Sequence, residues 1–276
     1  MKNRKAILPV LIFVLLAGNA FASPKRIVSL KPNITEILFA LGAGDRVVGA
    51  TKYCDYPEEA KKLPKVADYT RPFLEPIIAL KPDLVIGSRE ESSRKSIEEL
   101  QKLGIEAAIL PFTTLDETIS SILAISQIVG RAHEGEMIVR GMRARLSEVK
   151  NRWEKAPKKR VLAVVGRRPL IVFGQNTYMD EILKVVGAEN VVEARSVKYP
   201  RWSAENVITA NPDVILDFSM GSETADPQDV LKSWGELKTV GAVREKRVYP
   251  VEISEFRQSP RIVDGVERLA KLIHSP

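Results

Sequence analysis

The sequence predicts an α/β fold in which two similar lobes are joined by one long helix. Three observations predict it. Residues 75–86 and 205–216 repeat one pattern: a Glu opens a helical turn, and a Pro-Asp pair leads into an aliphatic run. Short apolar runs alternate with amphipathic segments in both halves of the chain, which is typical of parallel sheets with helical crossovers. Between the halves, residues 132–155 keep apolar side chains at helical spacing.

The two repeated segments each indicate a helix, a turn and a buried strand. Glu75 and Glu205 suit the positive end of a helix dipole, and a Pro just past the last turn cannot continue the helix. A Pro-Asp pair before aliphatic residues also occurs by chance at the entry to parallel strands. Two matches about 130 residues apart, each with Glu eight positions before Asp, favour two similar lobes.

The first 22 residues differ from the rest of the chain. Three basic residues within positions 2–5 precede an apolar run over 6–17, and 20–22 form a small-x-small site. This pattern predicts a secretory signal peptide over 1–22, cleaved after Ala22, because the run is too short to span a bilayer comfortably as an anchor. The mature protein is therefore expected to be periplasmic and freely soluble.

Composition excludes several classes of function. Removing the signal peptide lowers the formal net charge from +7 to +4, and no dense basic stripe with interleaved aromatics is present, so nucleic acid is not an expected partner. The one cysteine, Cys54, cannot form an internal disulfide. We expect it to be a small semi-buried filler, with a metal or corrin ligand as the alternative.

The N-terminal lobe is expected over 23–112. Residues 26–30 predict the first strand, and Pro32 begins a helix that ends before Gly42. A strand at 47–48 leads into a loop over 51–57, a short helix over 58–63 and a second loop over 66–73. After the first repeated segment come a strand over 84–87, an amphipathic helix over 92–103 and a strand over 106–110.

Residues 113–156 are expected to form a helical linker. Its two helices cover 115–129 and 132–155, and at roughly 1.5 Å per residue the second would span about 36 Å, the diameter of a lobe. The methionines in its apolar stripe are interpreted as packing residues. The chain therefore predicts two Rossmann-like lobes with central, mainly parallel sheets on one long, rigid α-helix.

The C-terminal lobe is expected over 157–276, where the alternation restarts. Strands are predicted at 161–165, 191–192, 214–218 and 247–250, and helices at 178–186, 228–232 and 262–273. Residues 171–173 are expected to form a short strand or a loop. Loops are expected over 195–202 and 255–261. The first of these loops is rich in aromatic and basic residues.

Taken together and in order, several motifs carry a family resemblance over the whole mature chain. They are Ile27-Val28-Ser29-Leu30 with Pro32, Asn33, Thr35 and Glu36; Tyr53-Cys54-Asp55-Tyr56-Pro57; both Glu-to-Asp segments; Gly187 with Glu189-Asn190-Val191; and Ser259-Pro260-Arg261. The chain resembles class III periplasmic substrate-binding proteins of ABC importers, which include vitamin B12, haem and ferric siderophore receptors. Within this class it looks most like the vitamin B12 (cobalamin) binders.

The resemblance implies a monomer that holds a small molecule between two lobes with little hinge motion. It also implies a docking mode, in which one surface Glu from each lobe pairs with arginines on the two permease subunits in the inner membrane. The matching positions are Glu75 and Glu205. Two equivalent carboxylates on a body with approximate twofold symmetry suit a homodimeric partner, although a single such Glu is usually a helix-capping carboxylate.

The resemblance further implies ligand-binding aromatics on loops that face each other across the lobes. Matching positions are Tyr53, Tyr69 and Tyr199, with Arg257 near the closing segment. We add Trp202 and Phe256 from their loop positions, and expect some of these rings to be loop anchors instead. Flat rings with a few polar groups suit a planar macrocycle such as a corrinoid, carried as a ligand and not as a prosthetic group.

Two alternatives remain at this point. Tyrosines stand where vitamin B12 binders have tryptophans, and Ile253 where they have an acid, so haem or a ferric siderophore is the alternative ligand. A bare metal site is not expected, because the two histidines, His133 and His274, are interpreted as surface residues. Carboxylates near strand ends, such as Asp217, make an enzymatic function the other alternative, but no phosphate-binding loop or nucleophile motif supports it.

Overall fold

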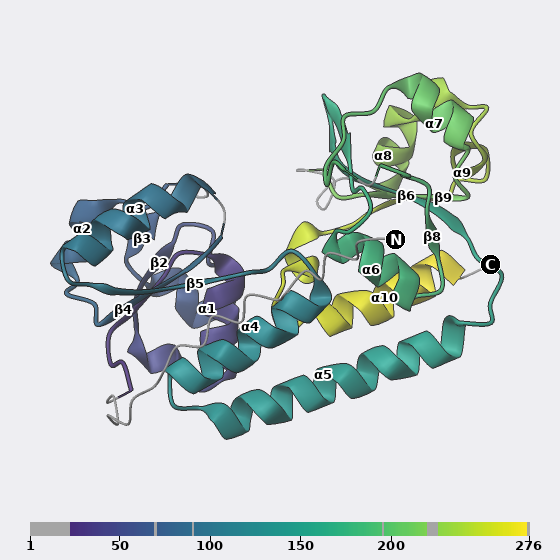
Figure 1. Ribbon diagram of the computed structural model, residues 1–276. Coiled ribbons are helices and arrows are strands. Elements are labelled where there is room, and N and C mark those ends of the chain that lie inside the picture. Colours follow the sequence, from purple (N-terminus) through teal and green to yellow (C-terminus); the bar gives the residue numbers. More distant parts are fainter. Residues whose placement is uncertain (1–22, 69–70, 90, 195, 220–225, 275–276) are drawn as a thin grey trace, which may run out of the picture.

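The computed structural model describes residues 23–68, 71–89, 91–194, 196–219 and 226–274, with the side chains of 91–95 and 227 left aside. The expected signal peptide and Tyr69 lie outside the described residues. Figure 1 shows two α/β lobes side by side, with a long helix running beneath both. The predicted α/β fold class is confirmed.

The first lobe is built on a five-stranded, fully parallel sheet in the order β3-β2-β1-β4-β5. Its strands are β1 (Ile27–Ser29), β2 (Val47–Thr51), β3 (Lys65–Ala67), β4 (Leu84–Ser88) and β5 (Glu106–Leu110). β1 and β4 lie at the centre and are buried along their whole length, as expected for a sheet covered on both faces. The strand β3 corrects the prediction of a loop over 66–73, because a three-residue edge strand carries too little periodicity to be recognised.

Three helices flank this sheet: α1 (Pro32–Ala40), α2 (Leu74–Ala79) and α3 (Glu91–Lys102). Pro32 occupies the first turn of α1, where its missing N–H costs nothing. The short helix expected over 58–63 is a 3-10 helix, Glu58–Lys62, and another covers Gly44–Arg46.

The connection between the sheets consists of α4 (Leu115–Ile128) and α5 (Ala132–Trp153), and Thr114 caps α4 by accepting the Glu117 N–H. The 22 residues of α5 span about 33 Å. Val139, Met142 and Val149 of α5 are buried against the core, whereas Met137 is half exposed. None of the helices in the described part of the chain is both long and apolar enough to cross a bilayer.

The second lobe contains a five-stranded sheet in which β10-β9-β6-β7 follow one another and β8 pairs with β6. The strands are β6 (Arg160–Arg167), β7 (Leu170–Val172), β8 (Glu189–Asn190), β9 (Val214–Asp217) and β10 (Val248–Pro250). Only the β6–β7 hairpin among these pairs is antiparallel. β8 lies just before the strand predicted at 191–192.

The described residues of the second half form the helices α6 (Tyr178–Val185), α7 (Ala204–Ala210), α8 (Pro227–Ser233), α9 (Gly241–Arg244) and α10 (Ile262–His274). The single-turn helix α9 was not predicted. Two 3-10 helices, Gly235–Leu237 and Ile253–Phe256, were not predicted either, and the second lies at the loop expected over 255–261. These helices are too short to show a helical period in the sequence, so the hydrophobic pattern does not predict them.

The two repeated segments have the same structure down to single hydrogen bonds. In each segment the helix is followed by a residue in the left-handed conformation, Lys81 with φ +47° in the first and Asn211 with φ +40° in the second. The Asp83 carboxylate then accepts the backbone N–H of Arg26 at 2.9 Å, and Asp213 accepts that of Arg160 at 2.8 Å. Each Asp thus fixes the start of the neighbouring strand, β1 or β6, beside the strand that it precedes.

The same two arginines close the helices of the repeated segments. The Arg26 guanidinium donates to the carbonyls of Leu80 at 2.7 Å and Lys81 at 3.2 Å, and Arg160 donates to that of Asn211, the equivalent of Lys81, at 3.4 Å. These carbonyls lie just past the ends of α2 and α7, where helix C=O groups lack intrahelical partners. The sequence repeat therefore reflects a true structural repeat.

Candidate functional site

A cavity of about 430 Å³ lies between the lobes, at the carboxyl ends of the first sheet's central strands. This edge is where α/β sheets bind ligands, because the loops that leave parallel strands meet there. The second lobe closes the cavity with the loop before α7 and the segment after η4, the 3-10 helix Ile253–Phe256. The lining residues are Lys31, Asn33, Ser88, Arg89, Phe112, Thr113, Lys198, Tyr199 and Gln258.

Two hydrogen bonds cross the cavity between the lobes. Lys198 Nζ donates to Thr113 Oγ1 at 3.5 Å, and Asn33 Nδ2 donates to the Gln258 carbonyl at 3.4 Å. Both are at the long end of the range for such bonds, so they hold the lobes together only weakly.

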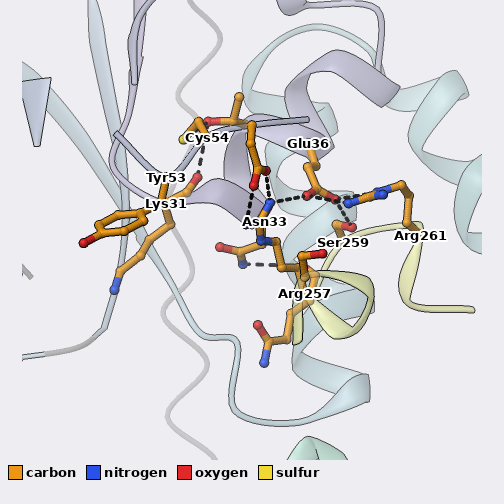
Figure 2. A network of polar contacts seen from close by, with 12 residues as sticks. Lys31, Asn33, Glu36, Tyr53, Cys54, Arg257, Ser259 and Arg261 are labelled. Carbon is orange, nitrogen blue, oxygen red and sulfur yellow. Dashed lines mark hydrogen bonds and ion pairs between the residues drawn. The ribbon is translucent and has the colours of Figure 1, made fainter. Parts of the chain in front are cut away.

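A stronger link between the lobes is the Glu36 network, formed by Glu36, Asp55, Arg257, Ser259 and Arg261. Glu36, on α1 of the first lobe, is almost fully buried, with its side chain 2% exposed. Arg261 donates to both carboxylate oxygens of Glu36, at 3.1 and 3.0 Å, and Ser259 Oγ donates at 2.6 Å. Figure 2 shows these side chains converging on the carboxylate from the segment that precedes α10.

Arg257 joins the same network through two carboxylates. Its Nη1 donates to Glu36 at 3.2 Å and also to Asp55, and its Nη2 donates to the second Asp55 oxygen at 3.1 Å. Partial burial raises the pKa of Asp55, but the hydrogen bonds and charge of Arg257 outweigh it, and the net pKa lies below its ordinary value. Arg257 was expected to contact the ligand; in this structure its guanidinium binds protein carboxylates.

The aromatic residues predicted for the ligand site have different environments. Tyr53 and Tyr199 are 40% and 47% exposed, one from each lobe, and Tyr199 lines the cavity. Phe256 is 1% exposed and packs edge-on against Phe218, so it is a core residue and not a ring presented to a ligand. Trp202 is partly buried against the second lobe's core. The structure thus brings one predicted ring, Tyr199, to the cavity wall.

The two acids expected to dock a permease are both exposed, and they lie on different lobes. Glu75 is in the first turn of α2 and Glu205 in the first turn of α7. Figure 1 places α2 and α7 on the sides of their lobes that face away from α5. Hydrogen bonding from the Ser203 side chain, then from its own backbone, lowers the pKa of Glu205 below its ordinary value.

Cys54 and His274 both contact neighbouring protein groups. Cys54 is 2% exposed, and its sulfur is 3.1 Å from Thr35 Oγ1 and 3.2 Å from Thr51 Oγ1, so it fills a small polar core site. His274, interpreted as a surface residue, is half-buried: it stacks on Trp153 and its Nε2 lies 2.7 Å from the Val186 carbonyl. Among the described residues, no cluster of three or more His, Cys, Asp or Glu could hold a metal.

Sequence reasoning missed most of the cavity's polar lining. Lys31 lies two residues after β1, Ser88 ends β4 and Arg89 follows it. Gln258 is next to Arg257 in the sequence. The signal that could have identified the first three is their position at the carboxyl ends of two predicted parallel strands.

The chain matches the family model described as periplasmic binding protein over residues 27–252. It is 33% identical over 260 residues to an uncharacterized ABC transporter substrate-binding lipoprotein of Bacillus subtilis, covering 91% of this chain and 80% of that protein. It is 30% identical over 244 residues to a vitamin B12-binding protein of Vibrio parahaemolyticus, covering 88% and 86%.

Solved structures are similar over almost the whole chain. The periplasmic vitamin B12 binding protein of Vibrio cholerae superposes with a TM-score of 0.79 at 27% identity, covering 91% of this chain and 97% of that one. The apo form of a periplasmic heme-binding protein from Roseiflexus sp. RS-1 gives 0.81 at 30% identity, covering 91% and 98%.

Proposed function

This chain belongs to the periplasmic binding protein family, and we propose that it captures a corrinoid between its two lobes and delivers it to a membrane importer. As an ABC transporter substrate-binding protein it binds a small molecule and is not an enzyme, which agrees with the prediction from sequence. The importer supplies the permease and the ATPase that it works with. Which ligand it carries is the part that we propose.

The observation that carries the corrinoid proposal is the likeness to several vitamin B12-binding proteins at 30–32% identity over 74–88% of this chain. The cavity between the lobes is consistent with it. Tyr199 and Phe112 offer flat apolar surface at the cavity, and hydrogen-bonding groups such as Asn33 and Gln258 lie beside them.

Haem or a ferric siderophore is the second candidate, and one specific observation favours it. The Roseiflexus heme-binding protein is as similar in fold and sequence as the vitamin B12 binder of known structure. Tyr53 supplies an exposed phenol on the first lobe, a group that can ligate iron.

Isothermal titration with cyanocobalamin, haem and a ferric siderophore, run side by side on the same protein preparation, tests the ligand. We expect micromolar or tighter binding of cyanocobalamin. Tighter binding of haem or of the siderophore would replace the corrinoid, and affinities no better than about millimolar for all three would refute the proposal.

We also propose that Glu75 and Glu205 dock one permease subunit each, in a periplasmic location reached by cleavage after Ala22. Their exposure on two lobes supports the docking role, because a twofold partner needs one acid per half. N-terminal sequencing of the exported protein tests the cleavage: we expect it to begin at Ser23, and retention of residues 1–22 would contradict it.

A further inference from the structure

The cavity between the lobes is cationic. Three of its lining residues carry a positive charge: Lys31 follows β1, Arg89 follows β4, and Lys198 comes from the second lobe. No Asp or Glu is among the described residues that line it. Within the described part of the chain, moreover, no carboxylate pairs with Arg89 or Lys198, in contrast to Arg257 with its two carboxylates.

Cations gathered in one cavity repel one another, although solvent partly screens Arg89 and Lys198, which are both exposed. Lys31 is 6% exposed, so its ammonium is largely withdrawn from solvent. An anion bound among these groups lowers their mutual repulsion. The arrangement therefore favours a ligand with a negative group at this end of the cavity.

Ser88 provides an independent indication of a ligand. The residue is 6% exposed, it lines the same cavity at the end of β4, and its Oγ has no hydrogen-bond partner in the described structure. A buried hydroxyl without a partner costs free energy, so native structures rarely leave one. A ligand oxygen that accepts from Ser88 Oγ, beside Arg89, would satisfy it.

We propose that Lys31, Ser88, Arg89 and Lys198 form an anion subsite that holds a carboxylate or phosphate group of the bound metal macrocycle. This inference rests on the proposed function, because it assigns a part of the same cleft. Tyr199 and Phe112 line the same cavity, where their rings would contact the flat body of the ligand. The subsite fixes the orientation of the macrocycle, since the charged end of the ligand can enter only where the cations lie.

Two of the candidate ligands carry an anionic group that could bind this subsite. The nucleotide loop of cobalamin carries a phosphate diester, and haem carries two carboxylates. Cobinamide, a corrinoid without the nucleotide phosphate, is the matched probe that lacks the anion. The subsite predicts that the anionic ligand loses affinity as salt rises, and that cobinamide does not.

The test is titration calorimetry of the full mature chain with cyanocobalamin, cobinamide and haem. The variants are Arg89→Gln, Lys198→Gln and Ser88→Ala, and Lys238→Gln serves as a control because Lys238 is an exposed lysine that does not line the cavity. We expect Arg89→Gln and Lys198→Gln each to weaken the binding of the anionic ligand by about tenfold, since a hydrogen bond to a charged group is lost. Cobinamide binding and the control should stay unchanged.

Ser88→Ala separates ligand contact from stability. Because the hydroxyl has no partner among the residues that the structure describes, we expect an unchanged or higher melting temperature together with weaker binding of the anionic ligand. Loss of affinity for cyanocobalamin alone assigns the subsite to the phosphate, and loss for haem alone assigns it to the carboxylates. If both cyanocobalamin and haem bind every cation variant as tightly as the unchanged protein, the subsite is overturned but the proposed function stands. Failure of every macrocycle to bind overturns both.

Discussion

The two repeated segments are alike on the outside of the molecule and unlike where the lobes face each other. On the outside, each repeat presents one exposed acid, Glu75 or Glu205, and one exposed isoleucine three residues later, Ile78 at 40% and Ile208 at 47%. Residues three apart lie on the same side of a helix, so each acid has an apolar neighbour.

The inner faces break this likeness. The first lobe contributes Lys31, Ser88 and Arg89 to the cavity, whereas the second contributes Lys198, Tyr199 and Gln258. The buried acids differ too: Glu36 on α1 pairs across the lobes, but Asp180 on α6 pairs with Lys184 of its own helix at 2.7 Å. This difference is the one that the proposed docking predicts: a twofold partner would need the two outer faces to be alike, whereas a single asymmetric ligand would not need the inner faces to match.

The largest effect is expected from removing both outer acids. Glu75→Ala combined with Glu205→Ala should abolish uptake of the ligand and leave its affinity intact, because neither residue lines the cavity. Transport into vesicles containing the importer, measured beside calorimetry, checks both quantities. Each single variant should lose part of the uptake, and the control Lys238→Gln none. Unchanged uptake in the double variant would reject the docking role.

The second test compares the buried acids. Glu36→Ala should lower the free energy of unfolding by about 3 kcal/mol, because it leaves the half-buried guanidinium of Arg261 without its carboxylate. Asp180→Ala should cost only about 1 to 2 kcal/mol, since Lys184 is exposed and Asn190 keeps its bond to the Phe173 carbonyl. Urea denaturation of both variants measures the difference, and equal losses would show that the link between the lobes adds no special stability.

A third test uses pH to weaken the link between the lobes. Arg257 holds the pKa of Asp55 below its ordinary value despite partial burial. Such a group stabilises the fold above its unfolded-state pKa, and that stabilisation is lost as pH falls through its lower, folded-state pKa. Asp55→Asn should therefore have a lower free energy of unfolding than the unchanged protein at neutral pH. This difference in free energy should disappear below about pH 4. A gap that stays constant down to pH 2 would contradict the role of the ionised pair.

The smallest effect is expected at the left-handed residues. Lys81→Gly should stabilise the protein by a few tenths to about 1 kcal/mol, because glycine adopts a positive φ without strain. Asn211→Gly should instead destabilise it by about 1 kcal/mol, since the Asn211 Oδ1 accepts the Gly241 N–H at 2.8 Å. Thermal unfolding distinguishes the two, and shifts of the same sign would mean that the two turns are equivalent after all.

The sequence by itself determined the α/β class, the repeat and the long helix. These follow from local patterns: the Glu-to-Asp spacing, the aliphatic strands after Asp83 and Asp213, and the helical period over 132–155. The two outer acids were singled out through the family resemblance, and the structure shows both of them exposed in the first turn of a helix.

Only the tertiary structure decided which side chains lie close to one another between the lobes. Arg257 and Phe256 are neighbours in sequence, yet one pairs with Asp55, about 200 residues earlier, and the other is buried against Phe218. Lys31 and Lys198 meet at one cavity although 167 positions separate them. Local patterns specify an element and its buried face, but contacts between loops depend on how the two lobes are placed on α5, and no local pattern encodes that placement.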